Sequence, residues 1–275
     1  MKKRYGALTA FVLATGAAAA VNRLIFNRCE AALKNGKIKT PAYKNLTNRH
    51  VYKWRYGNVN YVVYGSGEPV LLVHDADIGG SLADWAKLIP LLARQYTVYA
   101  VDLPGYGLSD KPKLTYSSYL YASFVNDFVA DCVGESVCAV ADGLAAGFVA
   151  AGCKFMPGLY SKILLLPNND NKKTSFILSR FFGRFLTIPV YGTLAYNIIT
   201  SKAAIGAQKY ILSHIGGAGN KYAVSAFIRK FFYIDTDRII NKIIIPVRVI
   251  KNGPRKKYSS DPRAFYRLIK NFFDS

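Results

Sequence analysis

The sequence has little cysteine, and its four cysteines show neither CxxC pairs nor metal-ligand spacing. Three of the four lie in apolar segments, where a thiol behaves as a small hydrophobic group. The sequence therefore excludes a disulfide scaffold, and no metal site or cofactor is expected. The cysteines are Cys29, Cys132, Cys138 and Cys153.

Acidic residues are also scarce, since 16 Asp and Glu face 37 Lys and Arg. Residues 1–57 carry 12 basic residues and 1 acid, residues 58–161 carry 5 and 10, and residues 162–275 carry 20 and 5. Basic flanks around a mildly acidic centre favour anionic partners, either lipid headgroups or nucleic acid. No nucleic-acid-binding signature appears, so a membrane surface is the expected partner. A basic surface that is simply solvated remains the alternative.

Charge is absent from residues 5–22, which follow three basic residues at the N-terminus. An apolar helix of about 20 residues spans a bilayer, so residues 1–28 are interpreted as an N-terminal transmembrane anchor. A cleaved signal peptide is the alternative, because the alanine-rich end offers A-x-A sites. Residues 29–54 are interpreted as a basic linker. Because positive loops tend to remain cytoplasmic, a single-pass anchor with a cytoplasmic domain is favoured over export.

Residues 69–112 predict a compact strand, loop, helix and strand unit. Its first strand, at 70–73, is continuously apolar, as expected of a strand buried on both faces. Five apolar residues then recur at helical spacing and predict one face that lies on a sheet. They are Leu82, Trp85, Leu88, Ile89 and Leu92.

This unit resembles the α/β-hydrolase superfamily. The resemblance is carried by the turn His74-Asp75 after a buried strand, by Trp85 in the following helix, and by D-L-P-G-Y-G-x-S-D-K-P at 102–112. It extends from about residue 55 to the end of the chain. It implies an α/β-hydrolase fold, with a mainly parallel sheet flanked by helices and a helical cap.

The rest of the chain alternates strands and helices as such a sheet requires. Strands are expected at 59–64, 97–101, 136–141, 162–166 and 243–250, and helices at 116–133, 144–156 and 261–273. The domain is expected over 55–275, with the cap insertion at about 171–240. The cap segment is aromatic and apolar, which indicates a lipid-like ligand or membrane contact, although packing within the domain explains the same residues. Asp261 is the expected N-cap of the last helix.

The resemblance implies a nucleophile in a small-x-nucleophile-x-small turn between a strand and a helix. The matching segment is VADGLAAG, where Ala141 and Ala145 supply the small residues. The nucleophile position then falls on Gly143, which has no side chain to form an ester intermediate. A shifted frame puts Asp142 there, as in haloalkane dehalogenases and epoxide hydrolases, but the valine and leucine beside it would crowd the turn.

The base and the acid of a hydrolase triad are missing from their expected positions as well. The family's histidine would follow the last strand, yet the only histidines are His50, His74 and His214. His74 matches the family's loop histidine, which is usually structural, and His50 falls in the expected linker. His214 falls in the cap and could point into the cleft. The acid would follow Gly253, where the sequence has Pro-Arg-Lys-Lys.

A binding architecture remains. Backbone N–H groups after His74 and at the elbow need no particular side chain, so Asp75, Ala76, Gly143 and Leu144 form the expected oxyanion or ligand pocket. An apolar cap could enclose a ligand above it. The sequence therefore predicts a membrane-anchored, noncatalytic α/β-hydrolase-fold protein that binds an anionic lipid, an apolar acyl ligand or a protein partner.

An active hydrolase of ester-type bonds is the alternative hypothesis. It would use a non-standard site around Asp142, with His74 or His214 as the base. Fold resemblance alone supports it, and a fold does not establish a function.

Overall fold

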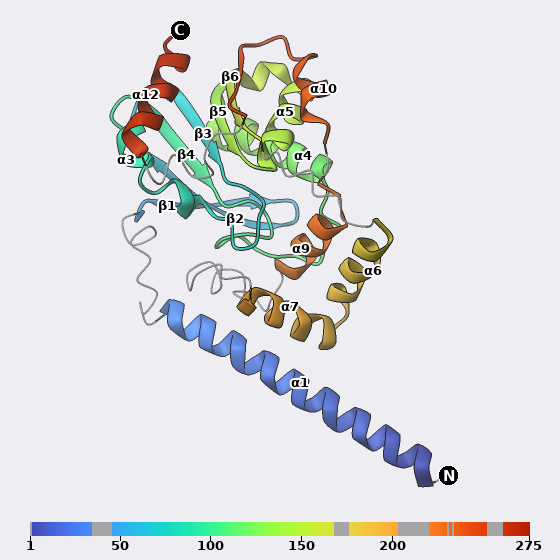
Figure 1. Cartoon of the computed structure of the whole chain (residues 1–275). Helices are drawn as coiled ribbons and strands as arrows, with labels where there is room; N and C mark the ends of the chain where they lie inside the picture. The colour runs from blue at the N-terminus through green and yellow to red at the C-terminus, as the bar shows by residue number, and fades with distance from the viewer. Residues whose placement is uncertain are drawn as a thin grey trace.

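The computed structural model describes residues 2–34, 46–167, 176–202, 220–229, 231–232, 234–251 and 261–275. In these residues a seven-stranded sheet of order β1-β2-β4-β3-β5-β6-β7 forms the centre of the domain (Figure 1). Its strands are β1 (Arg49–Trp54), β2 (Gly57–Tyr64), β3 (Pro69–Val73), β4 (Thr97–Val101), β5 (Val137–Asp142), β6 (Tyr160–Leu166) and β7 (Val247–Val249). β2 is antiparallel to both β1 and β4, and all other pairs are parallel, which confirms the predicted mainly parallel sheet.

The central strand β3 is buried on both faces, as its apolar sequence predicts. Val70 and Leu72 belong to one core with Trp85, whereas Leu71 and Val73 belong to the other core. The split follows from strand geometry, because successive side chains point to opposite faces of a sheet. One five-residue run therefore joins two hydrophobic cores.

Helices cover both faces of the sheet (Figure 1). One face carries α4 (Ser118–Phe128), the π-helical turn η2 (Val129–Val133) and α5 (Ala145–Phe155). The other carries the 3-10 helix η1 (Leu82–Trp85), α3 (Ile89–Leu92) and α12 (Pro262–Phe273). The short elements η3 (Pro157–Leu159) and α10 (Thr236–Ile240) lie before β6 and β7. Asp261 caps α12 as predicted, since its side chain accepts a hydrogen bond from the Ala264 amide at 3.0 Å.

The apolar residues predicted as one helical face around 82–92 are buried, but they do not form one helix. The segment contains η1 and then the separate four-residue α3. Pro90 lies at the start of α3, and a proline has no amide to continue the hydrogen-bonded ladder of a preceding helix. The predicted apolar face is therefore formed by two short helices, η1 and α3, instead of one.

The expected linker at 29–54 contains the edge strand β1, so this boundary of the interpretation was wrong. β1 pairs with β2 along its whole length, from Arg49 opposite Val62 to Trp54 opposite Gly57. Its sequence RHVYKW mixes charged and apolar residues. Such a pattern gives little signal, because an edge strand pairs on one side only and exposes much of its length to solvent.

Three helices between β6 and β7 form the described part of the cap: α6 (Phe176–Thr187), α7 (Tyr191–Lys202) and α9 (Asn220–Ile228). Leu186, Tyr196 and Val224 form a small buried cluster between them. Ile78, from the loop after β3, packs against this cluster. The side chain of Asn220 donates to the carbonyl of Gly105, in the loop after β4, at 2.6 Å. The cap therefore lies over the loops that follow β3 and β4.

The N-terminal helix α1 (Lys2–Lys34) runs past the cap, and its N-terminal end extends away from the domain (Figure 1). Its segment Thr9–Ala32 is long and apolar enough to cross a membrane. A signal sequence meets the same criterion of length and composition.

The buried carboxylate of Asp102 ties the end of β4 to three other segments. Oδ1 accepts from the Leu82 amide at 2.7 Å. Oδ2 accepts from Asn60 Nδ2 at 2.7 Å and from the Leu108 amide at 2.9 Å. Gly107 has a φ of 47°, and a Cβ there would overlap this carboxylate. The second glycine of D-L-P-G-Y-G is thus required both by the backbone and by the space beside Asp102.

Replacing Asp102 by Ala is expected to lower the free energy of unfolding by about 3 kcal/mol or more, because two buried N–H donors and one part-buried N–H donor lose their acceptor. Chemical denaturation of the full chain in detergent measures the change. Asp237→Ala is the control, because its surface ion pair with Lys251 is worth less than about 1 kcal/mol. Equal losses for the two variants would contradict the structural role of Asp102.

Candidate functional site

The turn between β5 and α5 lies beside the loop after β3 because these strands are parallel neighbours. In their register Val73 lies opposite Ala141. Asp75 and Gly143 each follow two residues later, so both lie at the carboxyl edge of the sheet. Ligand sites of open α/β sheets form at this edge.

Gly143 has the backbone geometry of a nucleophile elbow. Its φ is 58°, a left-handed conformation that strains a residue with a side chain. The flanking Ala141 and Ala145 are fully buried, so the turn is as tight as the small-residue pattern requires. Asp142 has no such positive φ. The geometry therefore favours the frame in which Gly143, and not Asp142, occupies the nucleophile position.

The side chain of Asp75 fills the space beside Gly143. Its Oδ1 accepts a hydrogen bond from the Leu144 amide at 2.8 Å. A Cβ placed on Gly143 would overlap the Asp75 carboxyl group. In serine hydrolases of this fold, the amide after the nucleophile is an oxyanion donor. Here that donor is engaged by a carboxylate, which lies where the side chain of a nucleophile would begin.

His74 is fully buried, and backbone groups engage both of its ring nitrogens. Nε2 accepts from the Leu103 amide at 3.0 Å, which leaves the proton on Nδ1, and Nδ1 donates to the carbonyl of Asp75 at 2.8 Å. The Tyr106 ring packs edge-on against the imidazole, with centroids 5.7 Å apart. His74 therefore joins the loops after β3 and β4, and in this arrangement neither nitrogen can accept a proton from a substrate.

Tyr106 is a site residue that sequence reasoning missed. Its hydroxyl donates to the carbonyl of Ala76 at 2.9 Å and so holds the loop that carries Asp75. Burial raises the pKa of Tyr106 well above its ordinary value, and the nearby Asp77 and Asp75 raise it further. The phenol therefore stays neutral and acts as a donor. The signal was its place between the two glycines of D-L-P-G-Y-G.

The structure does not bring the other candidate histidines to the elbow. His50 lies on the edge strand β1 and stacks on Tyr61, with centroids 5.3 Å apart. The strands β2, β4 and β3 separate it from β5. His214 lies outside the described residues. Asp142 is half-buried at the end of β5, where it lies opposite Leu166 of β6.

The described part of the chain contains no candidate metal site. No group of three or more His, Cys, Asp or Glu lies close enough there to hold an ion. The four cysteines are free thiols, and burial raises the pKa of Cys132, Cys138 and Cys153. None of these three is poised as a thiolate nucleophile at neutral pH.

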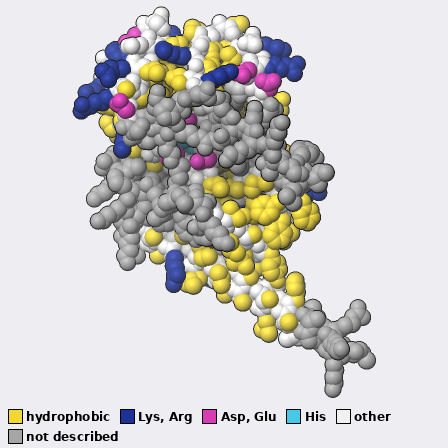
Figure 2. Space-filling model, viewed as in Figure 1, with side chains coloured by type: hydrophobic (Ala, Val, Ile, Leu, Met, Phe, Trp, Pro, Cys, Tyr) yellow, Lys and Arg dark blue, Asp and Glu magenta, His cyan; other side chains and the backbone are white. Residues whose placement is uncertain are grey.

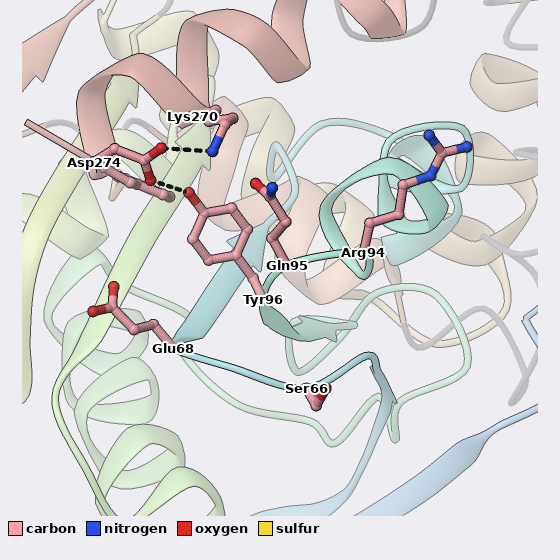
Figure 3. A pocket seen from close by; sticks show the side chains of 8 residues that line it. Ser66, Glu68, Arg94, Gln95, Tyr96, Lys270 and Asp274 are labelled. Atoms are coloured by element: carbon pink, nitrogen blue, oxygen red, sulfur yellow. Dashed lines mark hydrogen bonds and ion pairs between the residues drawn. The ribbon is translucent and has the colours of Figure 1, made fainter.

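An open hollow at the opposite end of the sheet is a separate feature (Figure 3). It lies where β3 and β4 begin and where α12 ends, so it is far from the carboxyl edge. Asp274 accepts from the Tyr96 hydroxyl at 2.7 Å and pairs with Lys270 at 2.6 Å. These contacts attach the last turn of α12 to the sheet, and the hollow lies at the edge of this contact between α12 and the sheet.

The sheet order, the cap between β6 and β7 and the elbow at Gly143 are those of the α/β-hydrolase fold. The family described as alpha/beta hydrolase fold matches residues 68–137. That match covers β3, η1, α3, β4 and α4, the part of the chain that carries the Asp75 loop and Asp102.

Known proteins resemble the chain at two levels. An uncharacterised protein of Mycobacterium tuberculosis is 34% identical over 129 residues, which cover 47% of this chain and 36% of that protein. The structure of a serine hydrolase involved in carbazole degradation matches with a TM-score of 0.63 at 16% identity, over 82% of this chain and 98% of the other. A membrane phospholipase A matches with a TM-score of 0.62 at 18% identity, over 100% and 98%.

These similarities establish the fold and not the activity. The matched segment spans little more than a third of the mycobacterial relative, and both solved structures are under 25% identical. The membrane phospholipase match covers the whole of this chain, including α1.

Gly143→Ala is expected to destabilise the protein more than Gly134→Ala does. Both glycines have positive φ, but a Cβ at Gly134 meets no atom within 4 Å, whereas one at Gly143 overlaps Asp75. Backbone strain costs each variant about 1–3 kcal/mol. The excess at Gly143 is the cost of displacing the carboxylate.

A double-mutant cycle measures that excess in chemical denaturation. Combining Gly143→Ala with Asp75→Ala is expected to recover about 0.5–3 kcal/mol relative to additivity. The pair Gly134→Ala with Asp75→Ala is the control and should be additive. Additivity at Gly143 would show that Asp75 does not occupy this space.

Proposed function

We propose that this chain is a membrane-associated α/β-hydrolase-fold protein that binds an apolar or lipid-like ligand, or a protein partner, without hydrolysing esters through a serine-type site. One observation carries the proposal. The Asp75 carboxylate accepts a hydrogen bond from the Leu144 amide and fills the space beside Gly143 that the side chain of a nucleophile would occupy.

The loss of serine-type chemistry follows from two independent facts. Gly143 has no side chain, and therefore no hydroxyl or thiol with which to form an acyl intermediate. The Leu144 amide, which would stabilise a developing oxyanion, already donates to a carboxylate. A substrate carbonyl would have to displace Asp75 before it could be polarised. A single serine at position 143 would therefore not restore the reaction.

Asp75 also narrows the class of ligand. A carboxylate at the elbow repels an acid or phosphate group placed beside it, because two like charges at close range disfavour each other. A ligand bound beside the elbow would therefore place a neutral, apolar part there, such as an acyl chain. An anionic headgroup would have to lie away from the elbow.

Membrane association rests on α1 and not on the net charge. The segment Thr9–Ala32 is mostly exposed and apolar enough to span a bilayer. In the view of Figure 2, by contrast, Lys and Arg side chains gather mainly at the end of the domain away from α1. The whole-chain match to a membrane phospholipase A supports the same association. Retention of α1 as an anchor, with the domain in the cytoplasm, is part of the proposal, and removal as a signal sequence is its alternative.

A carboxylate-based hydrolase is the second candidate function. The specific observation in its favour is that Asp75 places a carboxylate at the nucleophile position, with one oxygen on the donor amide. Attack by that carboxylate on the acyl carbon of an ester would expel the alcohol and form a mixed anhydride, and hydrolysis of the anhydride would need a base to activate water. His74 is engaged and His50 is remote, so this candidate depends on His214 in the cap or on a carboxylate such as Asp142.

Purified full-length protein is expected to show no turnover of p-nitrophenyl esters at any acyl chain length and no labelling by a fluorophosphonate. The reason is the absence of a nucleophile at Gly143. The assay includes Asp75→Ala, Asp142→Ala and His214→Ala, with Asp237→Ala as a surface control, and circular dichroism verifies folding. Lipids that copurify with the protein are identified by mass spectrometry.

Turnover that is lost in Asp75→Ala or Asp142→Ala, but kept in Asp237→Ala, would replace the binding proposal by the carboxylate-based hydrolase. Fluorophosphonate labelling at any serine would contradict both candidates.

Leu13→Arg is expected to weaken association with lipid vesicles, because a charge at the centre of a spanning helix costs about 2.5–3.5 kcal/mol. Leu13 is 69% exposed on α1, so the change leaves the domain intact. Asn27→Arg, on the exposed and already charged part of α1, is the control. Vesicle flotation measures association, and mass spectrometry of the N-terminus distinguishes a retained anchor from a cleaved signal sequence.

A further inference from the structure

One face of α1 packs against the cap. Its contacting residues recur at intervals of three and four, which places them on one side of a helix. Phe11 and Thr15 meet Tyr191 at the start of α7, and Phe26 packs against the buried cluster of the cap. Ala18 and Cys29, on the same side of α1, are buried. The apolar helix is therefore attached to the cap along much of its length.

Two buried carboxamides fix this attachment. Asn22 of α1 is 5% exposed and Asn197 of α7 is 3% exposed. Asn197 Nδ2 donates to Asn22 Oδ1 at 2.8 Å, and Asn22 Nδ2 donates to the carbonyl of Val190 at 3.0 Å. Thr15 and Tyr191 add a contact of 2.6 Å between their hydroxyl oxygens. Because an unpaired carboxamide in apolar surroundings is costly, these pairs set the register of α1 on α7.

The outward faces of the same helices are apolar and exposed. On α1 these residues are Val12, Leu13, Val21 and Leu24, and on the cap they are Phe181, Phe182, Ile188 and Ile198. Phe181 is the most exposed of these cap residues, at 75%. Figure 2 shows hydrophobic side chains gathered over the cap and along α1. A patch of this extent marks an interaction site.

The contacts with α1 determine how far the start of α7 would lie below the lipid headgroups if α1 is inserted in a bilayer. Arg23 and Arg28 are exposed on α1 and belong at the level of the lipid headgroups when the uncharged segment 5–22 is inserted. Thr15 lies about 12 Å along the helix from Arg23, on the inserted side. Tyr191, which contacts Thr15, must therefore lie below the headgroups together with the end of α6.

We infer that the corner between α6 and α7, with Phe181, Phe182 and Ile188, is a second lipid-contacting element that inserts into the bilayer alongside α1. The inference rests on the proposed membrane association and adds the surface and the depth of contact. The occupant is lipid, because the patch continues the surface of a candidate span and lies beside the uncharged segment 5–22 of α1, although the exposed Arg184 of α6 is part of this corner. The Asn22–Asn197 pair holds this corner at its depth.

Tryptophan fluorescence in the full chain tests the inference. The protein has two tryptophans, and both Trp54 and Trp85 are buried in the domain, at 6% and 0% exposure. Phe181→Trp adds one at the proposed corner. Ile244→Trp is the matched control, because Ile244 is 85% exposed beside α10, at the end of the domain away from α1 (Figure 1). Each variant is reconstituted in phosphatidylcholine vesicles with and without brominated acyl chains.

The added emission of Phe181→Trp is expected at a shorter wavelength than that of Ile244→Trp and is expected to be lost in brominated vesicles. Flotation of the same samples separates the two proposals. Protein that floats while the tryptophan at 181 is quenched no more than the one at 244 overturns the inference and leaves the anchor standing. Protein that does not float overturns both.

A second variant tests the carboxamide pair. Asn22→Leu makes α1 more apolar, so vesicle association should persist, but it removes the contacts with Asn197 and Val190. In the Phe181→Trp background it is expected to reduce quenching, whereas Asn27→Leu, on the exposed side of α1, should leave quenching unchanged. Equal quenching in the two would show that the pair does not hold the corner at its depth.

Discussion

The parallel pairing of β3 with β5 is the constraint on which the site depends. It places the residues after both strands at one edge of the sheet, in a register that brings Asp75 level with Gly143. The positive φ of Gly143 turns the chain into α5 and points the Leu144 amide toward Asp75. In a hydrolase this arrangement brings a nucleophile and an oxyanion donor together. Here the same arrangement brings together the Asp75 carboxylate and the Leu144 amide that donates to it.

Two aspartates with acceptor roles, the buried Asp102 and the half-buried Asp75, hold the loops around the glycine elbow. Asp102 serves the scaffold, because its carboxylate joins β2, η1 and the loop after β4. Asp75 serves the elbow, because it satisfies an amide that a substrate oxygen would otherwise use. His74 connects the two regions through the Leu103 amide and the Asp75 carbonyl. Stability of the loops and closure of the oxyanion position therefore come from the same set of polar contacts.

The cap joins this site to the N-terminal helix. Asn220 and Ile78 connect the cap to the loops over the elbow, and Asn22 connects it to α1. Buried carboxamides in an apolar setting specify a register that hydrophobic contact alone would leave loose. A helix that resembles a simple anchor by composition is thus also a packing partner of the cap. The position of α1 and the position of the cap are consequently linked.

The sequence by itself determined the sheet and the glycine at the nucleophile position of the elbow. Continuous apolar strands, the D-L-P-G-Y-G loop and a glycine between two alanines are local patterns, and local sterics and burial dictate what they form. Only the tertiary structure decided which group fills the elbow, why neither nitrogen of His74 is free, and that His50 lies on an edge strand. It also decided that Asn22 faces α7. Each of these outcomes depends on a partner distant in the chain, and the register that brings such partners together is set by packing of the whole domain.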